Sequence, residues 1–235
     1  MTENYYAGVY WPSRKESPEA CARRAASLFQ GISTLDPTWA NWFGTGKSRK
    51  QALEKRLPPI ASTFEQLFSL RKHQLVSGFS FVAWNGEADG STTGVTCTCG
   101  VASPYLSNVC TVNPPRRGPI AERLIDATVM SRTLQAMALA WEPEWGVATS
   151  DLHRDEVLKT ATPGTFVGWV MYFSHSWGTV PPLPAPVRIE PVADKGTLII
   201  LTPERFTASN PEHVALAAQV QELLDRAGLL RPLQA

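Results

Sequence analysis

Residues 44–48 (GTGKS) have the composition of a loop that could bind phosphate. The complete phosphate-binding pattern requires a glycine five residues before Gly46, and the chain has Asn41 at that position. Such a loop also follows a buried strand, whereas this one follows residues 39–43 (WANWF). We therefore interpret the stretch as a glycine turn that leads into a helix capped by Ser48.

Cysteine could supply a metal site through Cys97, Cys99 and Cys110. A structural zinc site usually needs two pairs of ligands, each pair separated by about two to four residues, and the sequence has no second pair. In an alternating strand Cys97 and Cys99 point to the same face. We interpret them as small buried thiols of a sheet core, and the sequence predicts no metal and no other cofactor.

Histidine and serine could supply hydrolase chemistry at residues 174–176 (SHS), and His153 is a second candidate base. Neighbouring serine and histidine side chains point to opposite faces of a strand and seldom form a dyad. The sequence also lacks the G-x-S-x-G turn that exposes a nucleophilic serine. We therefore interpret His175 as a histidine at the end of a strand, and a small hydrolase that uses His175 or His153 stays an alternative.

Composition and charge narrow the class of protein. The chain has 235 residues, of which 43% are hydrophobic, and this length suits one large domain, residues 1–235, better than two small ones. A formal net charge of +1 gives no overall field to attract nucleic acid or a membrane. Without a long apolar run or a signal-peptide pattern, and with only four cysteines, the sequence predicts a cytoplasmic protein with reduced thiols.

Two apolar stretches predict the interior of a sheet. Residues 165–173 (TFVGWVMYF) and 196–201 (GTLIIL) are apolar on both faces, which is typical of strands covered on both sides. Residues 180–186 (VPPLPAP) lie between them, and proline cannot sit inside a sheet because it lacks a backbone donor. We expect two interior strands joined by a proline-rich surface excursion.

The remaining pattern predicts helices and strands in separate runs. We expect further strands over residues 5–11, 78–84, 95–101, 108–112 and 145–149, and helices over 18–31, 49–56, 63–73, 119–139, 151–159 and 211–228. This order lacks the regular alternation of a doubly wound fold. The prediction is an α+β fold, a single domain with a mixed, largely antiparallel sheet flanked by helices.

Acidic residues gather in residues 142–156, which contain five acids and one base. The loop after the predicted strand 78–84 adds two more acids. A solvated helix face would explain this pattern, and so would an acidic patch for a basic partner. The candidate partner-binding residues are Glu87, Asp89, Glu142, Glu144, Asp151, Asp155 and Glu156.

Motifs at both ends of the chain carry a family resemblance. The N-terminal set is Tyr6, Tyr10, Trp11, Arg14, Glu16, Cys21, Arg24, Phe29, Asp36, Pro37, Trp42, Gly46, Arg49 and Leu53. The C-terminal set is Gly168, Trp169, Tyr172, Gly196, Thr202, Glu204, Phe206, Asn210, Pro211 and His213. In this order and at this total length, the chain resembles the immunity protein 52 family of bacterial polymorphic toxin systems.

The resemblance implies an antitoxin that is encoded beside a toxin effector. Family members are associated with effectors that carry a restriction-endonuclease-like nuclease domain and are delivered by type VI secretion, among them effectors of pseudomonads. The implied function is to bind and neutralise the cognate nuclease toxin, which protects the producing cell and its siblings. The implied partner is that toxin, with no direct nucleic-acid or membrane partner and no catalytic residues. An adaptor or chaperone that loads an effector for secretion is the other alternative.

The mode of inhibition also follows from charge. Direct mimicry of DNA requires a strongly acidic protein, and a net charge of +1 argues against it. We expect a compact interface that contains the acidic residues named above. The aromatic residues of the motifs, Trp11, Trp42, Trp169 and Tyr172, are assigned to the core.

Overall fold

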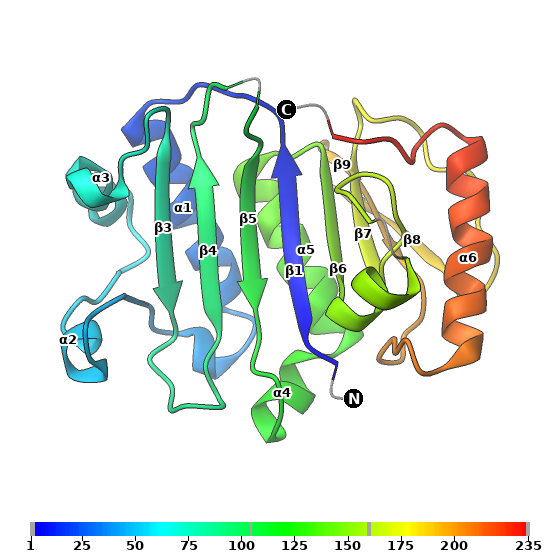
Figure 1. Cartoon of the computed structure of the whole chain (residues 1–235), viewed down its shortest axis with the longest axis horizontal. Helices are drawn as coiled ribbons and strands as arrows, with labels where there is room; N and C mark the ends of the chain where they lie inside the picture. Colours follow the sequence, from blue (N-terminus) through cyan, green and yellow to red (C-terminus); the bar gives the residue numbers. More distant parts are fainter. Residues whose placement is uncertain (1–2, 104, 159–160, 234–235) are drawn as a thin grey trace.

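A nine-stranded sheet forms the frame of the molecule in the computed structural model, which describes residues 3–103, 105–158 and 161–233. Every described strand pairing is antiparallel, and Figure 1 shows the sheet with its helices around it. In sheet order the strands are β2 (Phe43–Gly44), β3 (Phe79–Trp84), β4 (Gly94–Cys99), β5 (Asn108–Asn113), β1 (Tyr5–Trp11), β6 (Trp145–Ser150), β7 (Val170–Ser174), β9 (Gly196–Ile200) and β8 (Arg188–Val192).

Helices flank this sheet, which confirms the predicted α+β fold. They are α1 (Pro18–Ser33), α2 (Arg49–Leu53), α3 (Ala61–Ser69), α4 (Pro119–Leu124), α5 (Ala127–Trp141) and α6 (Pro211–Arg226), with short helical turns η1 (Pro37–Trp39), η2 (Arg71–His73) and η3 (His153–Val157). None of the described helices is both long and apolar enough to cross a bilayer.

The main core lies between the sheet and the pair α1 and α5, which pack behind it in Figure 1. Trp11 of β1 stacks on Trp141 of α5 with ring centroids 5.3 Å apart, and Phe29 of α1 meets Phe81 of β3 at 6.1 Å. The four motif aromatics assigned to the core are all buried, which confirms that assignment. Cys97, Cys99 and Cys110 are buried free thiols on the same side, as predicted.

Side-chain caps fix the helix starts that the sequence predicts. The Ser17 hydroxyl accepts a hydrogen bond from the Ala20 amide at 3.3 Å, and the Asn210 carboxamide oxygen accepts one from the Glu212 amide at 3.0 Å. Ser48 caps α2 in the same way, accepting from the Gln51 amide. Each cap satisfies an amide that lacks a partner within its helix.

The interior strand pair is confirmed as β7 and β9, but its position and length differ from the prediction. β1, not β7, is the middle strand of the sheet. Residues 165–169 form a loop over the sheet, so β7 begins at Val170. Phe166 packs edge-on against Trp145, and Gly168 lies against Val147 and Thr149. These residues are apolar because they cover the sheet rather than extend it.

Three helices also differ from their predicted forms. The helix expected over residues 119–139 is two helices, because Ile125 leaves helical geometry at ψ 61° and Asp126 caps α5. The helix expected over residues 151–159 is present over 151–157, but its residues 153–157 form the π-helical turn η3. Gly31 lies inside α1 rather than at its end. The edge strands β2 and β8 are not predicted, because they are too short to show a clear alternation of apolar and polar residues.

The second face of the sheet is half covered. Over β6 and β7 the segment with Phe166 and Gly168 closes it, so every β6 residue is buried. Over β3, β4, β5 and β1 no helix lies in front of the strands in Figure 1. Side chains in register across this part include the exposed Val82 and Thr96 and the half-buried Thr111. The residues of β1 are buried except for the half-buried Tyr10, so we call only the surface of β3, β4 and β5 the open face.

Candidate functional site

The predicted acidic residues lie at two opposite ends of the sheet. Glu142 and Glu144 precede β6, and Asp151 and Asp155 follow it. Five residue steps at about 3.4 Å separate the ends of β6 by roughly 17 Å. Residues 142–156 are therefore neither one acidic patch nor one helix face, because a buried strand divides them. The loop with Glu87 and Asp89 lies at the same end as Asp151, the lower end in Figure 1.

Glu142 is exposed and forms ion pairs with two other residues of the chain at the upper end. Its carboxylate oxygens lie 2.9 Å from Lys195 Nζ and 2.9 Å from an Arg24 guanidinium nitrogen. The hydrogen bonds from Lys195 and Arg24 lower the pKa of the Glu142 carboxyl. Glu144 lies beside these ion pairs and borders a hollow of about 280 Å³ together with Tyr172 and Lys195. Glu142 therefore joins the end of α5 to α1 and to the turn before β9.

At the lower end, Asp151 ties the start of β1 to the end of β6. Its carboxylate accepts hydrogen bonds from the Asn4 amide at 3.0 Å and from the Asn4 side chain at 2.7 Å. Asp155 is exposed and is paired with Arg154, whose guanidinium lies 5.2 Å from the ring centroid of Tyr6. The side chain of the seventh candidate, Glu156, lies outside the described residues.

The loop with Glu87 and Asp89 has a fixed base and a solvent-facing tip. At the base the buried Asn85 carboxamide oxygen accepts a hydrogen bond from the Thr93 amide at 2.9 Å. The Thr93 hydroxyl accepts another from the Trp39 indole at 2.8 Å. At the tip Glu87 is half-buried and Asp89 is exposed. The loop therefore holds two carboxylates in a defined place beside the open face.

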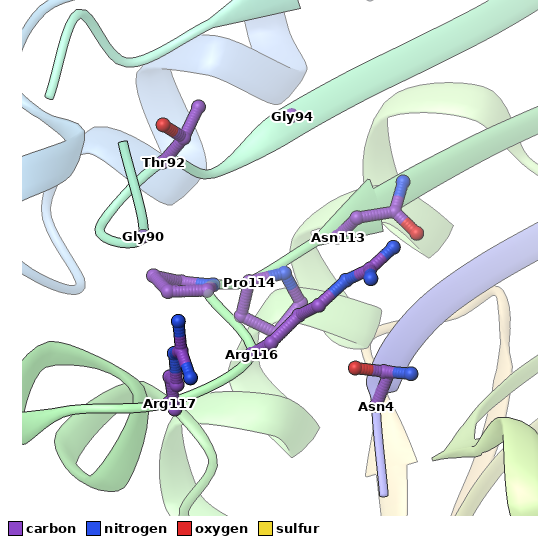
Figure 2. Close-up of a pocket in the computed structure, with 9 residues that line it drawn as sticks. Asn4, Gly90, Thr92, Gly94, Asn113, Pro114, Arg116 and Arg117 are labelled. Carbon is purple, nitrogen blue, oxygen red and sulfur yellow. The ribbon is translucent and has the colours of Figure 1, made fainter. Parts of the chain in front are cut away.

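A hollow that could not be predicted from the sequence lies between the loop with Glu87 and Asp89 and the start of β1, where Asp151 binds Asn4. It has a volume of about 660 Å³ and contains two exposed arginines, Arg116 and Arg117. Figure 2 shows Arg116 extending toward Asn113, while Arg117 lies on the side of Gly90. The lining residues are Asn4, Gly90, Thr92, Gly94, Asn113, Pro114, Pro115, Arg116 and Arg117.

The turn that carries the arginines follows from its sequence, residues 113–119 (NPPRRGP). Pro114 and Pro115 cannot donate to the sheet, so they end β5, and both are buried. Gly118 has φ 90°, a conformation that favours glycine, and it directs the chain into α4. Arg116 and Arg117 therefore project from a turn that is fixed on both sides.

A family model described as immunity protein 52 matches residues 3–233. The chain belongs to the immunity protein 52 family. No curated protein matches it. Among solved structures, one described as Pseudomonas aeruginosa T6SS protein PA0821 has 12% sequence identity and a TM-score of 0.62, and the match covers 96% of this chain and 73% of that one. At this identity the likeness shows a shared fold.

The candidate catalytic residues of this member of the immunity protein 52 family are Ser174, His175, Ser176 and His153. The Ser174 and Ser176 hydroxyls lie 2.8 Å apart, and His175 is exposed between them. His153 is buried, and its Nε2 lies 3.0 Å from the Val167 carbonyl. Burial lowers the pKa of the His153 imidazole. Within the described residues, no cluster of three His, Cys, Asp or Glu side chains could hold a metal ion.

Proposed function

We propose that this protein is an immunity protein that binds and neutralises a cognate nuclease toxin delivered by type VI secretion. The match of the family model across residues 3–233 carries this proposal. The description of a structural neighbour as a T6SS protein supports the secretion context. In this proposal the whole chain acts as one domain in the cytoplasm, and it protects the producing cell and its siblings by binding rather than by catalysis.

We place the toxin on the open face and the lower end of the sheet. Three strands of about six residues, spaced about 4.8 Å apart, present roughly 300 Å². A stable interface needs about 800 Å² on each partner, so the neighbouring loops have to contribute. The loops at the lower end border the open face and carry charge of both signs, which suits specific recognition of one partner.

The acidic contacts are proposed in two groups. Glu87 and Asp89 belong to the loop that borders the arginine hollow, and we assign them direct contact with basic residues of the toxin, together with Asp155 and Glu156. Asp151 also fixes Asn4, so we give it a positioning role in the same surface. Glu142 and Glu144 lie at the far end and contribute only if the toxin extends along the whole sheet.

Co-expression with the neighbouring gene tests the proposal. The two products are purified together through a tag on the immunity protein, and DNA cleavage by the toxin is measured with and without it. We expect a stable complex in which cleavage is suppressed. A complex that retains full cleavage would favour an effector-loading adaptor. Suppression of cleavage that is lost on His175→Ala or His153→Ala, while the complex still forms, would favour a hydrolase.

A pair of matched substitutions tests the open face. Thr96→Arg places a long charged side chain in the middle of the open face, where Thr96 is exposed. Leu139→Arg makes a comparable change on the outer surface of α5, where Leu139 is 45% exposed. We expect Thr96→Arg to weaken toxin binding by about tenfold or more and Leu139→Arg to leave it within about twofold. Equal affinities would place the toxin elsewhere.

A further inference from the structure

The hollow at the lower end of the open face is a cationic site. Arg116 and Arg117 are exposed there, and none of the described lining residues is acidic. Within the described residues neither guanidinium has an ion pair or a hydrogen bond. Each guanidinium offers planar donors that match the geometry of a carboxylate or a phosphate. The hollow therefore has unused capacity for an anionic group.

The other lining residues leave room for such a group beside the arginines. A Cβ atom at Gly90 or Gly94 would meet no atom within 4 Å, so the space above both residues is open. The Asn113 carboxamide donates a weak hydrogen bond of 3.4 Å to Thr111, and Thr92 bonds to the Ala88 carbonyl at 3.2 Å. A volume of about 660 Å³ is ample for one or two carboxylate side chains.

Charges of both signs lie at this end of the molecule. The loop with Glu87 and Asp89 leads directly into Gly90 and Thr92, which line one side of the hollow. Asp151 holds Asn4, which lines the other side, and Asp155 follows it in η3. Glu87 and Asp89, which form no ion pair within the described residues, therefore lie on one side of the arginines, while on the other side Asp151 is bonded to Asn4 and Asp155 is paired with Arg154. A partner that complements this surface has an acidic group for the arginines and a basic region for Glu87 and Asp89.

We propose that Arg116 and Arg117 bind one or more carboxylate side chains of the toxin, which enter the hollow while basic residues beside them meet Glu87 and Asp89. This inference rests on the proposed function. A nuclease that holds a divalent metal with carboxylates and nearby phosphates with lysine or arginine presents this combination of charges. Carboxylates that pair with the two arginines are withheld from the metal that cleavage requires.

The flanking acids favour a protein carboxylate over nucleic acid as the ligand of the hollow. A strand of DNA is longer than the hollow and would bring its phosphates against the acids of the neighbouring loop, Glu87 and Asp89. A chain with a formal net charge of +1 supplies no wider field to offset that repulsion.

Charge reversal at the arginines tests the inference with the full chain and its purified toxin. The test variant is Arg116→Glu with Arg117→Glu, and a neutral version is Arg116→Gln with Arg117→Gln. The matched control is Arg23→Glu with Arg132→Glu, which makes the same change in net charge at exposed positions of α1 and α5. Dissociation constants are measured at two salt concentrations, and the melting temperature of each variant verifies folding.

We expect the test variant to weaken toxin binding by about a hundredfold and the neutral variant by about tenfold, with the control within about threefold. Lysine substitution of the contacted toxin acid, found by scanning its Asp and Glu residues one at a time, should restore binding to the charge-reversed variant. The melting temperatures should not change, because both arginines are exposed.

Three outcomes would overturn the inference, and each is distinct. A complex of wild-type affinity in the test variant would show that the hollow does not contact the toxin, while the proposed function would stand. DNA binding by the wild type that is lost in the test variant would assign the hollow to phosphates. Failure of the wild type to bind the toxin would remove the proposed function itself and the inference with it.

Discussion

Asp36 is a nearly fully buried carboxylate at the start of η1. Arg123 of α4 pairs with it through two nitrogens, and both the amide and the hydroxyl of Thr38 donate to it. These hydrogen bonds, chiefly that from Arg123, lower the pKa of the Asp36 carboxyl to about 2. The pair joins two segments that are far apart in sequence, near α4 and the turn that carries Arg116.

We expect Asp36→Asn to reduce the free energy of unfolding at pH 7 by about 1–2 kcal/mol. The folded pKa is below the ordinary value of 3.8, so this contribution is complete above about pH 4 and disappears as the pH falls through about 2. Urea unfolding between pH 2 and 7 measures it. Glu222→Gln, which removes an exposed ion pair with Arg226, is the control and should change stability by less than about 0.5 kcal/mol. Parallel pH profiles for wild type and Asp36→Asn would contradict the assignment.

Only some residues of the candidate site can be predicted from the sequence. The density of acids selects Glu87, Asp89 and Asp155 as candidates for partner binding, and the structure places Glu87 and Asp89 in the loop that leads into one side of the hollow. The same density groups Glu142 with Asp151, which the buried strand β6 separates. Arg116 and Arg117 lie in a proline turn with no motif. Their place in a hollow depends on the fold, which brings Asn4 and the loop with Gly90 and Thr92 beside that turn.

At the scale of elements, the loop over residues 165–169 depends on close contact with β6. Gly168 lies directly against Val147, and a Cβ atom there would also be 3.0 Å from Thr149 Cβ. β6 is an interior strand that is buried along its whole length, so it cannot move without disturbing the core. A larger residue at position 168 would lift the loop from the second face of the sheet.

Gly168→Ala should therefore destabilise the protein by about 1–3 kcal/mol, because overpacking forces a strand or a loop to move. Gly94→Ala is the matched control, since a Cβ atom at Gly94 has no neighbour within 4 Å. Urea denaturation of both variants measures the difference. Equal stability of the two variants would mean that the loop moves away from β6 without cost.

The elements show why the fold class is predictable while some boundaries are not. Capping residues act locally, so Ser17, Ser48 and Asn210 mark their helices correctly. A run of apolar residues reports burial rather than backbone geometry, so residues 165–169 resemble the strand that they cover. The break at Ile125 has no proline or glycine to signal it. It follows from two helices that pack in different places.

At the scale of the whole molecule, charge is balanced overall but uneven locally. The loop with Glu87 and Asp89 lies at the lower end of the sheet, where it connects β3 and β4 (Figure 1). Exposed charges at an interface raise the association rate more than they raise final affinity. The acidic loop should therefore act mainly by steering a basic toxin surface.

We expect Glu87→Lys with Asp89→Lys to slow association with the toxin by about tenfold at low salt, and the difference should shrink above roughly 0.5 M salt. Glu222→Lys with Asp225→Lys makes the same change in net charge on α6 and serves as the control. Stopped-flow or surface-based kinetics give both rates. Equal slowing by the two variants would point to net charge rather than to this loop.

The strand order also bears on how the protein is made. β1 ends at Trp11, yet its neighbours in the sheet are β5, which begins at Asn108, and β6, which begins at Trp145. A ribosome adds about 5–20 residues per second, so the first strand waits on the order of ten seconds for its partners. A newly made chain cannot present the surface that we assign to the toxin until most of it has been translated. A cell struck by a toxin is therefore protected by the copies it has already folded.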